Sequence, residues 1–190
     1  MCIRDRIDGG LVSSAVVRRL SQGDTIKMGA PVGEQLTLPE DGPLPDLLMV
    51  AGGTGLAPLR AVLEQIDQSW QATGSAPRVH LFHGSRMPWN LYDHEHLTGL
   101  AQKPWFDYTP VVSEDSTYPG ARGLVGAVAA HANDWSGRTV MVCGSPAMVR
   151  HSVQELTTAG VPAASIRREQ FDFQGSASPT EELQDTLEIR

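Results

Sequence analysis

The sequence predicts an α/β fold in which a doubly wound, five-stranded parallel sheet carries helices on both faces. Short apolar runs alternate with segments of helical periodicity, which is the order typical of such a sheet. Several runs are apolar at consecutive positions, as strands are when both faces are covered. The chain of 190 residues is 41% hydrophobic and 19% charged, a composition able to bury a core. A mixed α+β fold with other strand pairing is the alternative.

Five short apolar segments are predicted strands, and four stripes of helical spacing are predicted helices between them. The strands are Leu47–Val50, Val79–Phe82, Tyr108–Val112, Thr139–Cys143 and Ile166–Phe171. The apolar positions of the helices are Leu59, Val62, Leu63 and Ile66; Leu97, Leu100 and Ala101; Leu124, Val125, Val128 and Ala129; and Met148, Val149, Val153 and Leu156. Asn90 is expected to cap the second helix, and Ser145 with Pro146 to open the fourth, which ends at Gly160.

The ends of the chain differ from this middle region, so we expect three parts: 1–45, 46–173 and 174–190. In the first part Val12, Val16 and Leu20 suit a short helix, and Gly23 with Asp24 suits a turn. Thr25–Met28 and Gln35–Leu38 are predicted strands. Two strands cannot bury a sheet face alone, so 1–45 is expected to be the end of a partial antiparallel β-barrel. The polar tail 174–190 is expected to be a linker or a short helix.

Charge and cysteine content exclude several classes of protein. With 15 Lys and Arg against 22 Asp and Glu, the net charge is −7, which argues against nucleic-acid binding. Two cysteines exclude a disulfide scaffold and a cysteine-ligated iron–sulfur cluster within this chain. No apolar run has transmembrane length, and no signal peptide is visible, so we expect a cytoplasmic protein. His94, Glu95 and His96 lack the spacing of a zinc site, and no metal site is expected.

A glycine-rich turn after the first strand is the strongest local motif. It comprises Gly52, Gly53, Thr54, Gly55, Leu56, Ala57 and Pro58. Glycines let the backbone approach a ligand closely, and the helix start offers amide groups to a pyrophosphate. Pro58 replaces the third glycine of the usual fingerprint, so the motif predicts a variant Rossmann-like dinucleotide site. A tight turn without a ligand is the alternative.

Two other segments carry weaker signals. Gly10, Ser13 and Ser14 at a helix start suit a phosphate, although an ordinary serine cap is favoured from the residues alone. Cys143 and Gly144 end a predicted strand, where ligands bind in open α/β sheets. The Cys143 thiol is therefore either beside a substrate or a buried small apolar group.

Taken in order, these motifs resemble the ferredoxin–NADP⁺ reductase superfamily. The order runs from Gly-Leu-Val-Ser-Ser through the glycine-rich turn to Val-Ser, Cys-Gly-Ser-Pro and the final Glu-Gln-Phe. It is most similar to the reductase part of bacterial flavohaemoglobins and oxygenase reductases, and it covers about Asp8 to Phe173.

The resemblance implies a role for each motif. Gly10, Ser13 and Ser14 match the FAD pyrophosphate motif, and Gly52 to Gly55 with Pro58 match the nicotinamide-dinucleotide loop. Cys143 and Gly144 match the segment beside the nicotinamide ring, and Glu169 and Phe171 the one near the flavin. Cys143, Glu169 and Phe171 are thus the expected catalytic residues. Such enzymes pass a hydride from NAD(P)H to FAD and electrons to a globin haem, a ferredoxin or an oxygenase.

The sequence departs from the family at its start. No Arg-x-Tyr-Ser motif, which grips FAD in the family, lies upstream of Gly10, and Met1 to Arg6 match no part of the pattern. We therefore expect a truncated flavin domain, with weak FAD binding or none and weak activity or none. A dinucleotide-binding module without catalysis is the alternative function.

The residues after the third strand favour NADH over NADPH. NADP-selective relatives have an arginine after the serine, whereas Ser113 is followed here by Glu114 and Asp115. Acidic groups suit ribose hydroxyls and repel a 2′-phosphate. Arg86 and Arg122 remain within possible reach of a phosphate, and a solvated turn is the alternative role of the acidic pair.

Overall fold

The computed structural model describes residues 16, 18–26, 35–39 and 42–170. The chain divides into two compact units, one of residues 33–171 and one of residues 1–32 with 172–190. In the second unit, Val16 and Arg18 are helical, and Asp24 donates from its amide to the Ser21 carbonyl to form the predicted turn (3.1 Å). All strands and helices below belong to the first unit.

The core of that unit is a six-stranded parallel sheet with the strand order β4-β3-β2-β1-β5-β6. The strands are β1 Leu47–Gly52, β2 Val79–Ser85, β3 Phe106–Val112, β4 Ala121–Arg122, β5 Thr139–Gly144 and β6 Ile166–Gln170. The predicted parallel α/β sheet is confirmed, and it has one strand more than predicted. The extra strand, β4, is two residues long and is defined by its pairing with Val111 and Val112, so no apolar run marks it.

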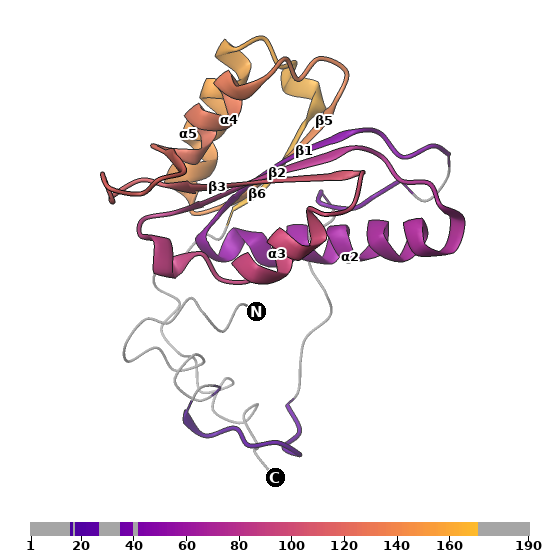
Figure 1. The fold of residues 1–190 in the computed structure, drawn as a ribbon, viewed down its shortest axis with the longest axis vertical. Coiled ribbons are helices and arrows are strands. Elements are labelled where there is room, and N and C mark those ends of the chain that lie inside the picture. The colour runs from indigo at the N-terminus through magenta and orange to yellow at the C-terminus, as the bar shows by residue number, and fades with distance from the viewer. Residues whose placement is uncertain (1–15, 17, 27–34, 40–41, 171–190) are drawn as a thin grey trace, which may run out of the picture. The chain divides into compact units, whose positions relative to one another are not determined.

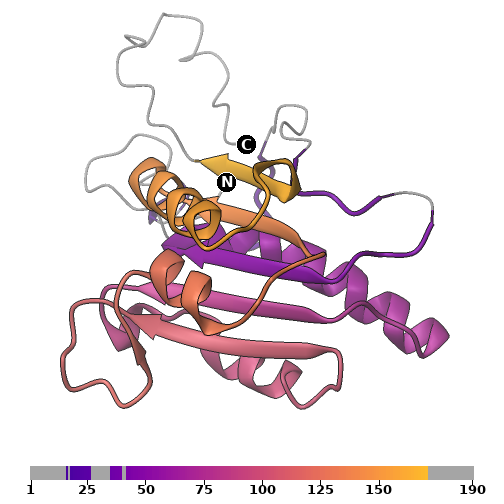
Figure 2. The ribbon, with the colours of Figure 1, turned by 90° about the horizontal axis from the view of Figure 1, so that it is seen from above.

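Helices cover both faces of the sheet (Figures 1 and 2). Helices α2 (Leu56–Thr73) and α3 (His94–Leu100) lie on one face, and α4 (Val125–Ala132) and α5 (Pro146–Thr158) on the other. Successive strand residues therefore point into two different cores. Leu47 and Met49 face α2, whereas Leu48 and Val50 face α4 and α5. This burial on both sides explains the continuous apolar runs.

Helix α3 begins later than predicted. Asn90 does not cap it but ends a short 3₁₀ turn, Pro88–Asn90, and Leu91 then leaves the helical region (φ −75°, ψ 76°). Asp93 occupies the N-cap position with a left-handed backbone (φ 56°). Leu91, which lies between the turn and the helix, is buried.

The predicted strand Gln35–Leu38 is wrong. Gln35 and Leu36 form a bend, and the next residues have no regular structure. Leu36 is 7% exposed and packs with Leu38 against the core on the α2 side. Arg167 in β6 donates a hydrogen bond from Nη1 to the Thr37 carbonyl (2.8 Å). The segment buries its apolar side chains by covering a core that already exists, so it needs no partner strand.

The other predicted strand, Thr25–Met28, lies partly outside the described residues. Thr25 and Ile26 are irregular, and Ile26 is 48% exposed. The barrel remnant and the three-part division of the chain stay predictions.

Candidate functional site

The carboxyl ends of all six parallel strands lie at one edge of the sheet, where ligands bind in open α/β folds. The strand order reverses at β1, because β2, β3 and β4 lie on one side of it and β5 and β6 on the other. The connections leaving β1 and β5 run to opposite faces, which opens a crevice between their carboxyl ends. Both predicted segments, the glycine-rich turn and Cys143-Gly144, end strands that border this switch point.

The glycine-rich turn packs directly on the backbone of β5. Gly53–Gly55 form a 3₁₀ turn between β1 and α2, and Gly53 has a positive φ of 52°. A Cβ added to Gly55 would lie 2.1 Å from the Cys143 carbonyl oxygen and 2.6 Å from the Gly144 nitrogen. Such distances are impossible, so only glycine permits this approach. The structure thus brings Gly52, Gly53, Gly55, Cys143 and Gly144 together.

The start of α2 suits an anion. The turn and the helix start have no side-chain cap hydrogen bond and no acidic residue in the first turn. Gly53 is exposed, while Pro58 lies in the first turn of α2. The helix start therefore offers amide groups and the positive end of the helix dipole, with no carboxylate in its own first turn. A pyrophosphate fits this chemistry, and the packing of Gly55 on β5 fixes the position of the turn that would hold it.

The structure decides between the two roles that the sequence left open for Cys143. Its side chain is fully buried in the core on the α2 side. Burial and, to a smaller extent, the nearby Glu169 carboxylate together raise the pKa of the thiol to about 12, so the group stays protonated. Glu169 is the register partner of Cys143 in β6. In this structure Cys143 is a buried small apolar residue.

Arg86, Ser113 and Glu114 follow the neighbouring strands β2 and β3, and all three are exposed. The Glu114 amide donates to the Arg86 carbonyl (2.8 Å), which holds the two loops side by side. The next residue, Asp115, accepts hydrogen bonds from the Thr117 hydroxyl and amide, which lower the pKa of its carboxyl. The guanidinium of Arg122 donates to the Ser116 carbonyl.

The remaining predicted site residues, Gly10, Ser13, Ser14 and Phe171, lie outside the described residues. Within the part of the chain that the structure describes, no group of three or more His, Cys, Asp or Glu side chains is placed to hold a metal ion. No described helix combines the length and hydrophobicity required to cross a membrane.

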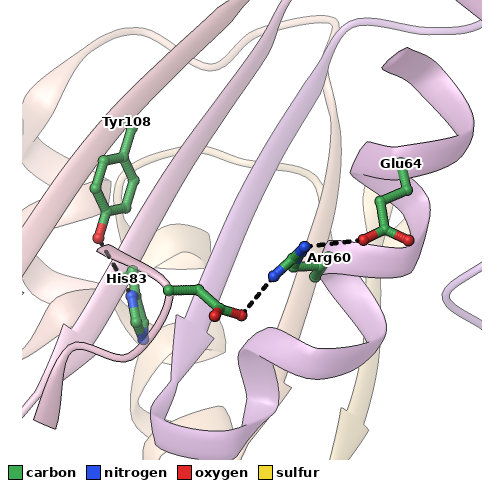
Figure 3. Close-up of polar contacts among 5 residues, drawn as sticks. Arg60, Glu64, His83 and Tyr108 are labelled. Carbon is green, nitrogen blue, oxygen red and sulfur yellow. Dashed lines mark hydrogen bonds and ion pairs between the residues drawn. The ribbon is translucent and has the colours of Figure 1, made fainter. Parts of the chain in front are cut away.

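The sequence did not predict a cluster of polar side chains that lies beneath α3 (Figure 3). His83 in β2 is fully buried, and its Nδ1 lies 3.3 Å from the Tyr108 hydroxyl, which in turn lies 3.2 Å from Nδ1 of His94. Nearby, Arg60 donates to Asp93 (2.6 Å) and pairs with Glu64 (3.1 Å). Strand alternation could have revealed the burial of His83, because it puts His83 on the same apolar face as Leu81.

Burial sets the protonation of this cluster. Burial, with a smaller contribution from His94, lowers the pKa of His83 to about 4, and the Asp93 carboxylate partly opposes this shift. Burial also raises the pKa of the Tyr108 hydroxyl. His83 and Tyr108 are therefore both neutral near pH 7.

A groove of about 500 Å³ runs between α2 and α3. Leu63, Leu97 and Leu100 line it together with charged residues that include the Lys103–Asp67 ion pair. None of the predicted site residues lines this groove, so we place the candidate site at the glycine-rich turn.

Fold and site together define an α/β domain with a glycine-rich turn at its switch point. The chain belongs to the oxidoreductase NAD-binding domain family, which residues 49–154, more than half of the chain, match.

Similar proteins agree with the resemblance stated from the motifs. The toluate 1,2-dioxygenase electron transfer component of Pseudomonas putida is 30% identical over 168 residues, covering 87% of this chain and 48% of that protein. The ferredoxin–NAD(P)⁺ reductase component of the naphthalene 1,2-dioxygenase/salicylate 5-hydroxylase systems of Ralstonia sp. is 31% identical, covering 87% and 49%. The chain spans about half the length of these curated relatives.

Solved structures show the same fold. The crystal structure of an Amycolatopsis cytochrome P450 reductase has a TM-score of 0.73 and 29% identity, covering 87% of this chain and 50% of that one. The flavohem-like FAD/NAD-binding domain of a Vibrio cholerae nitric oxide dioxygenase has a TM-score of 0.68 at 17% identity, covering 85% and 65%, and supports the fold alone.

Proposed function

We propose that this chain is the NAD(P)H-binding part of a flavin-dependent electron-transfer reductase. The observation that carries the proposal is the Gly52–Gly55 turn, which packs on the Cys143–Gly144 backbone at the switch point, where a side chain on Gly55 would collide with β5. The relatives named above are reductase and electron transfer components, which supports the same activity. Residue roles inferred from the resemblance are part of this proposal.

The described residues contribute binding and orientation. The Gly52–Gly55 turn and the start of α2 hold the pyrophosphate, with Thr54 and Pro58 in the same segment. Cys143 and Gly144 end β5 on the nicotinamide side and position the glycine-rich turn that packs on them, while the Cys143 thiol is buried and protonated. Glu169, as the register partner of Cys143, is a positioning residue at that edge.

FAD, when bound, accepts the hydride and releases electrons one at a time. The residues proposed to hold it, Gly10, Ser13, Ser14 and Phe171, lie outside the described residues, so no step is derived for them. A ferredoxin–NADP⁺ reductase of Neisseria gonorrhoeae with bound FAD and NADP has a TM-score of 0.62 and 25% identity over 86% of this chain and 71% of that one, which supports this pair of cofactors. The proposed acceptor is a ferredoxin, an oxygenase or a globin haem.

We propose NADH as the preferred dinucleotide. Glu114, whose amide donates to the Arg86 carbonyl, is exposed, and the Arg122 guanidinium is engaged by the Ser116 carbonyl. A carboxylate hydrogen-bonds ribose hydroxyls and repels a 2′-phosphate. Titration of the protein with NADH and NADPH tests this preference, and clearly tighter NADPH binding would contradict it.

The activity is tested by adding FAD, NADH and ferricyanide to the purified protein. Each NADH that is oxidised should reduce two ferricyanide ions, and Gly55→Val should abolish this reduction together with NADH binding. NADH binding without turnover would favour a dinucleotide-binding module without catalysis. No binding of NADH or NADPH at all would reject both functions.

The reaction is proposed to take place in the cytoplasm. Cys143 is a free thiol, as is usual in a reducing compartment. Fractionation of cells that express the protein tests this location.

A further inference from the structure

Trp89 is the most exposed large apolar side chain that is reported for the described residues. It is 75% exposed, whereas Trp105 is 4% and Trp135 is 3% exposed. The Trp70 ring lies against Lys103, with the ammonium 5.2 Å from its centroid. Single exposed apolar residues are common, so exposure alone indicates nothing. The backbone that carries Trp89 and its place in the fold make it informative.

The turn that carries Trp89 is held in place on both sides. Pro88 fixes the first position of the 3₁₀ turn, and the Asn90 amide donates to the Met87 carbonyl (3.0 Å). The Ser85 hydroxyl donates to the same Met87 carbonyl (2.8 Å). Buried Leu91 anchors the end of the turn. A rigid backbone that presents an indole to solvent loses little conformational entropy when a ligand binds.

The place of the turn is the ligand-binding edge of the sheet. Trp89 comes four residues after Ser85, the last residue of β2, and β2 is the neighbour of β1. Gly84 in β2 is in register with Gly52, where the glycine-rich turn begins. Figure 1 shows the connection from β2 to α3 at the same edge as the start of α2. Arg86, exposed and held by the Glu114 amide, lies between the strand and Trp89.

A dinucleotide whose pyrophosphate occupies the glycine-rich turn must extend to both sides of β1. On the β5 side the strand ends at Cys143 and Gly144, which are buried. On the β2 side the dinucleotide meets an exposed guanidinium, Arg86, and an exposed indole, Trp89. An indole face suits a purine ring, and a guanidinium suits the adjacent phosphate or ribose.

We propose that Trp89 is a binding residue that stacks on the adenine ring of the dinucleotide, with Arg86 beside it. This assignment rests on the proposed function and names the nucleoside that the β2 side of the site receives. Stacking of a base on an aromatic side chain is sequence-tolerant and strong enough to be measured by substitution.

The test uses the whole protein and fragments of the dinucleotide. ADP-ribose and AMP should quench the indole emission of the wild-type protein and of the matched control Trp70→Phe, but not that of Trp89→Phe. Trp89→Ala should weaken ADP-ribose binding, measured by calorimetry, by about five- to tenfold. Trp89→Phe keeps a ring and should bind ADP-ribose nearly as well as wild type. Unfolding by urea checks that each variant is folded.

Two outcomes separate failure of this assignment from failure of the proposed function. If the wild-type protein and Trp89→Ala bind ADP-ribose equally, the adenine assignment is wrong, the dinucleotide site stands, and Trp89 is free to contact a protein partner. If nicotinamide mononucleotide, and not AMP, quenches Trp89, the orientation is reversed and the assignment is also wrong. If the wild-type protein binds neither NADH nor ADP-ribose, the proposed function falls together with the assignment.

Discussion

His83 is a titratable side chain without exposed surface, and its neutral state is tied to the stability of the fold. Its ring lies between the Tyr108 hydroxyl and the Tyr92 ring, whose centroid is 5.5 Å away. Burial is the largest cause of its lowered pKa, and His94 and Asp93 act on it in opposite directions. In the unfolded chain the same group titrates near its ordinary pKa of 6.5.

The protein should therefore lose stability as the pH falls from about 6.5 towards 4. In this window the unfolded chain binds a proton at His83 that the folded protein does not, so the free energy of unfolding rises with pH. The expected loss from this group between pH 7 and pH 5 is about 2 kcal/mol. Urea unfolding at both pH values measures it, and His83→Gln should lose about 2 kcal/mol less than wild type over the same interval.

His96, which is exposed on α3, provides the control for this measurement. His96→Gln should keep the pH dependence of the wild-type protein. Equal pH dependence in wild type and His83→Gln would show that His83 is not the group responsible.

At the scale of elements, the contact between the β1–α2 turn and β5 decides the geometry of the candidate site. It depends on the absence of a side chain at Gly55, because the obstructing atoms are backbone atoms of Cys143 and Gly144. Backbone of a central strand cannot shift as a flexible side chain can. If position 55 carried a side chain, the turn and β5 would have to separate, and the crevice would change shape.

Gly55→Ala should therefore destabilise the protein by about 1–3 kcal/mol, the usual cost of overpacking a core. Gly99→Ala is the matched control, since Gly99 lies in α3 and a Cβ there meets nothing within 4 Å. That variant should be as stable as wild type or more stable by about 0.5–1 kcal/mol, because alanine favours helix. Urea unfolding compares the three proteins, and a Gly55→Ala protein as stable as wild type would contradict the packing described here.

The starts of α5 and α3 show which local sequence signals are enough to predict where a helix begins. Ser145 and Pro146 predicted the start of α5 correctly, since the Ser145 hydroxyl accepts from the Met148 amide (3.4 Å) and proline opens the helix. The start of α3 was mispredicted at Asn90. Its true N-cap, Asp93, has a left-handed backbone and an ion pair with Arg60 of α2, a partner 33 residues away.

At the scale of the molecule, two apolar cores lie on the two faces of one sheet. Every residue reported in these two cores falls within 36–166, inside the compact unit of residues 33–171. We therefore predict that a protein of residues 33–171 folds on its own, with a cooperative urea transition. Its NADH affinity should lie within about twofold of that of the full chain, since the described candidate site belongs to the same unit. A non-cooperative transition, or loss of NADH binding by a folded fragment, would contradict this prediction.

The sequence by itself determined the parallel α/β class, five of the six strands and the place of the glycine-rich turn. These features depend on local signals, namely apolar runs, helical spacing and glycine. Strand order, the burial of Cys143 and His83, and the exposed turn at Trp89 were decided only by the tertiary structure. The physical reason is that burial and ion pairing depend on segments far apart in the chain, such as β5 against the β1–α2 turn and Arg60 against Asp93.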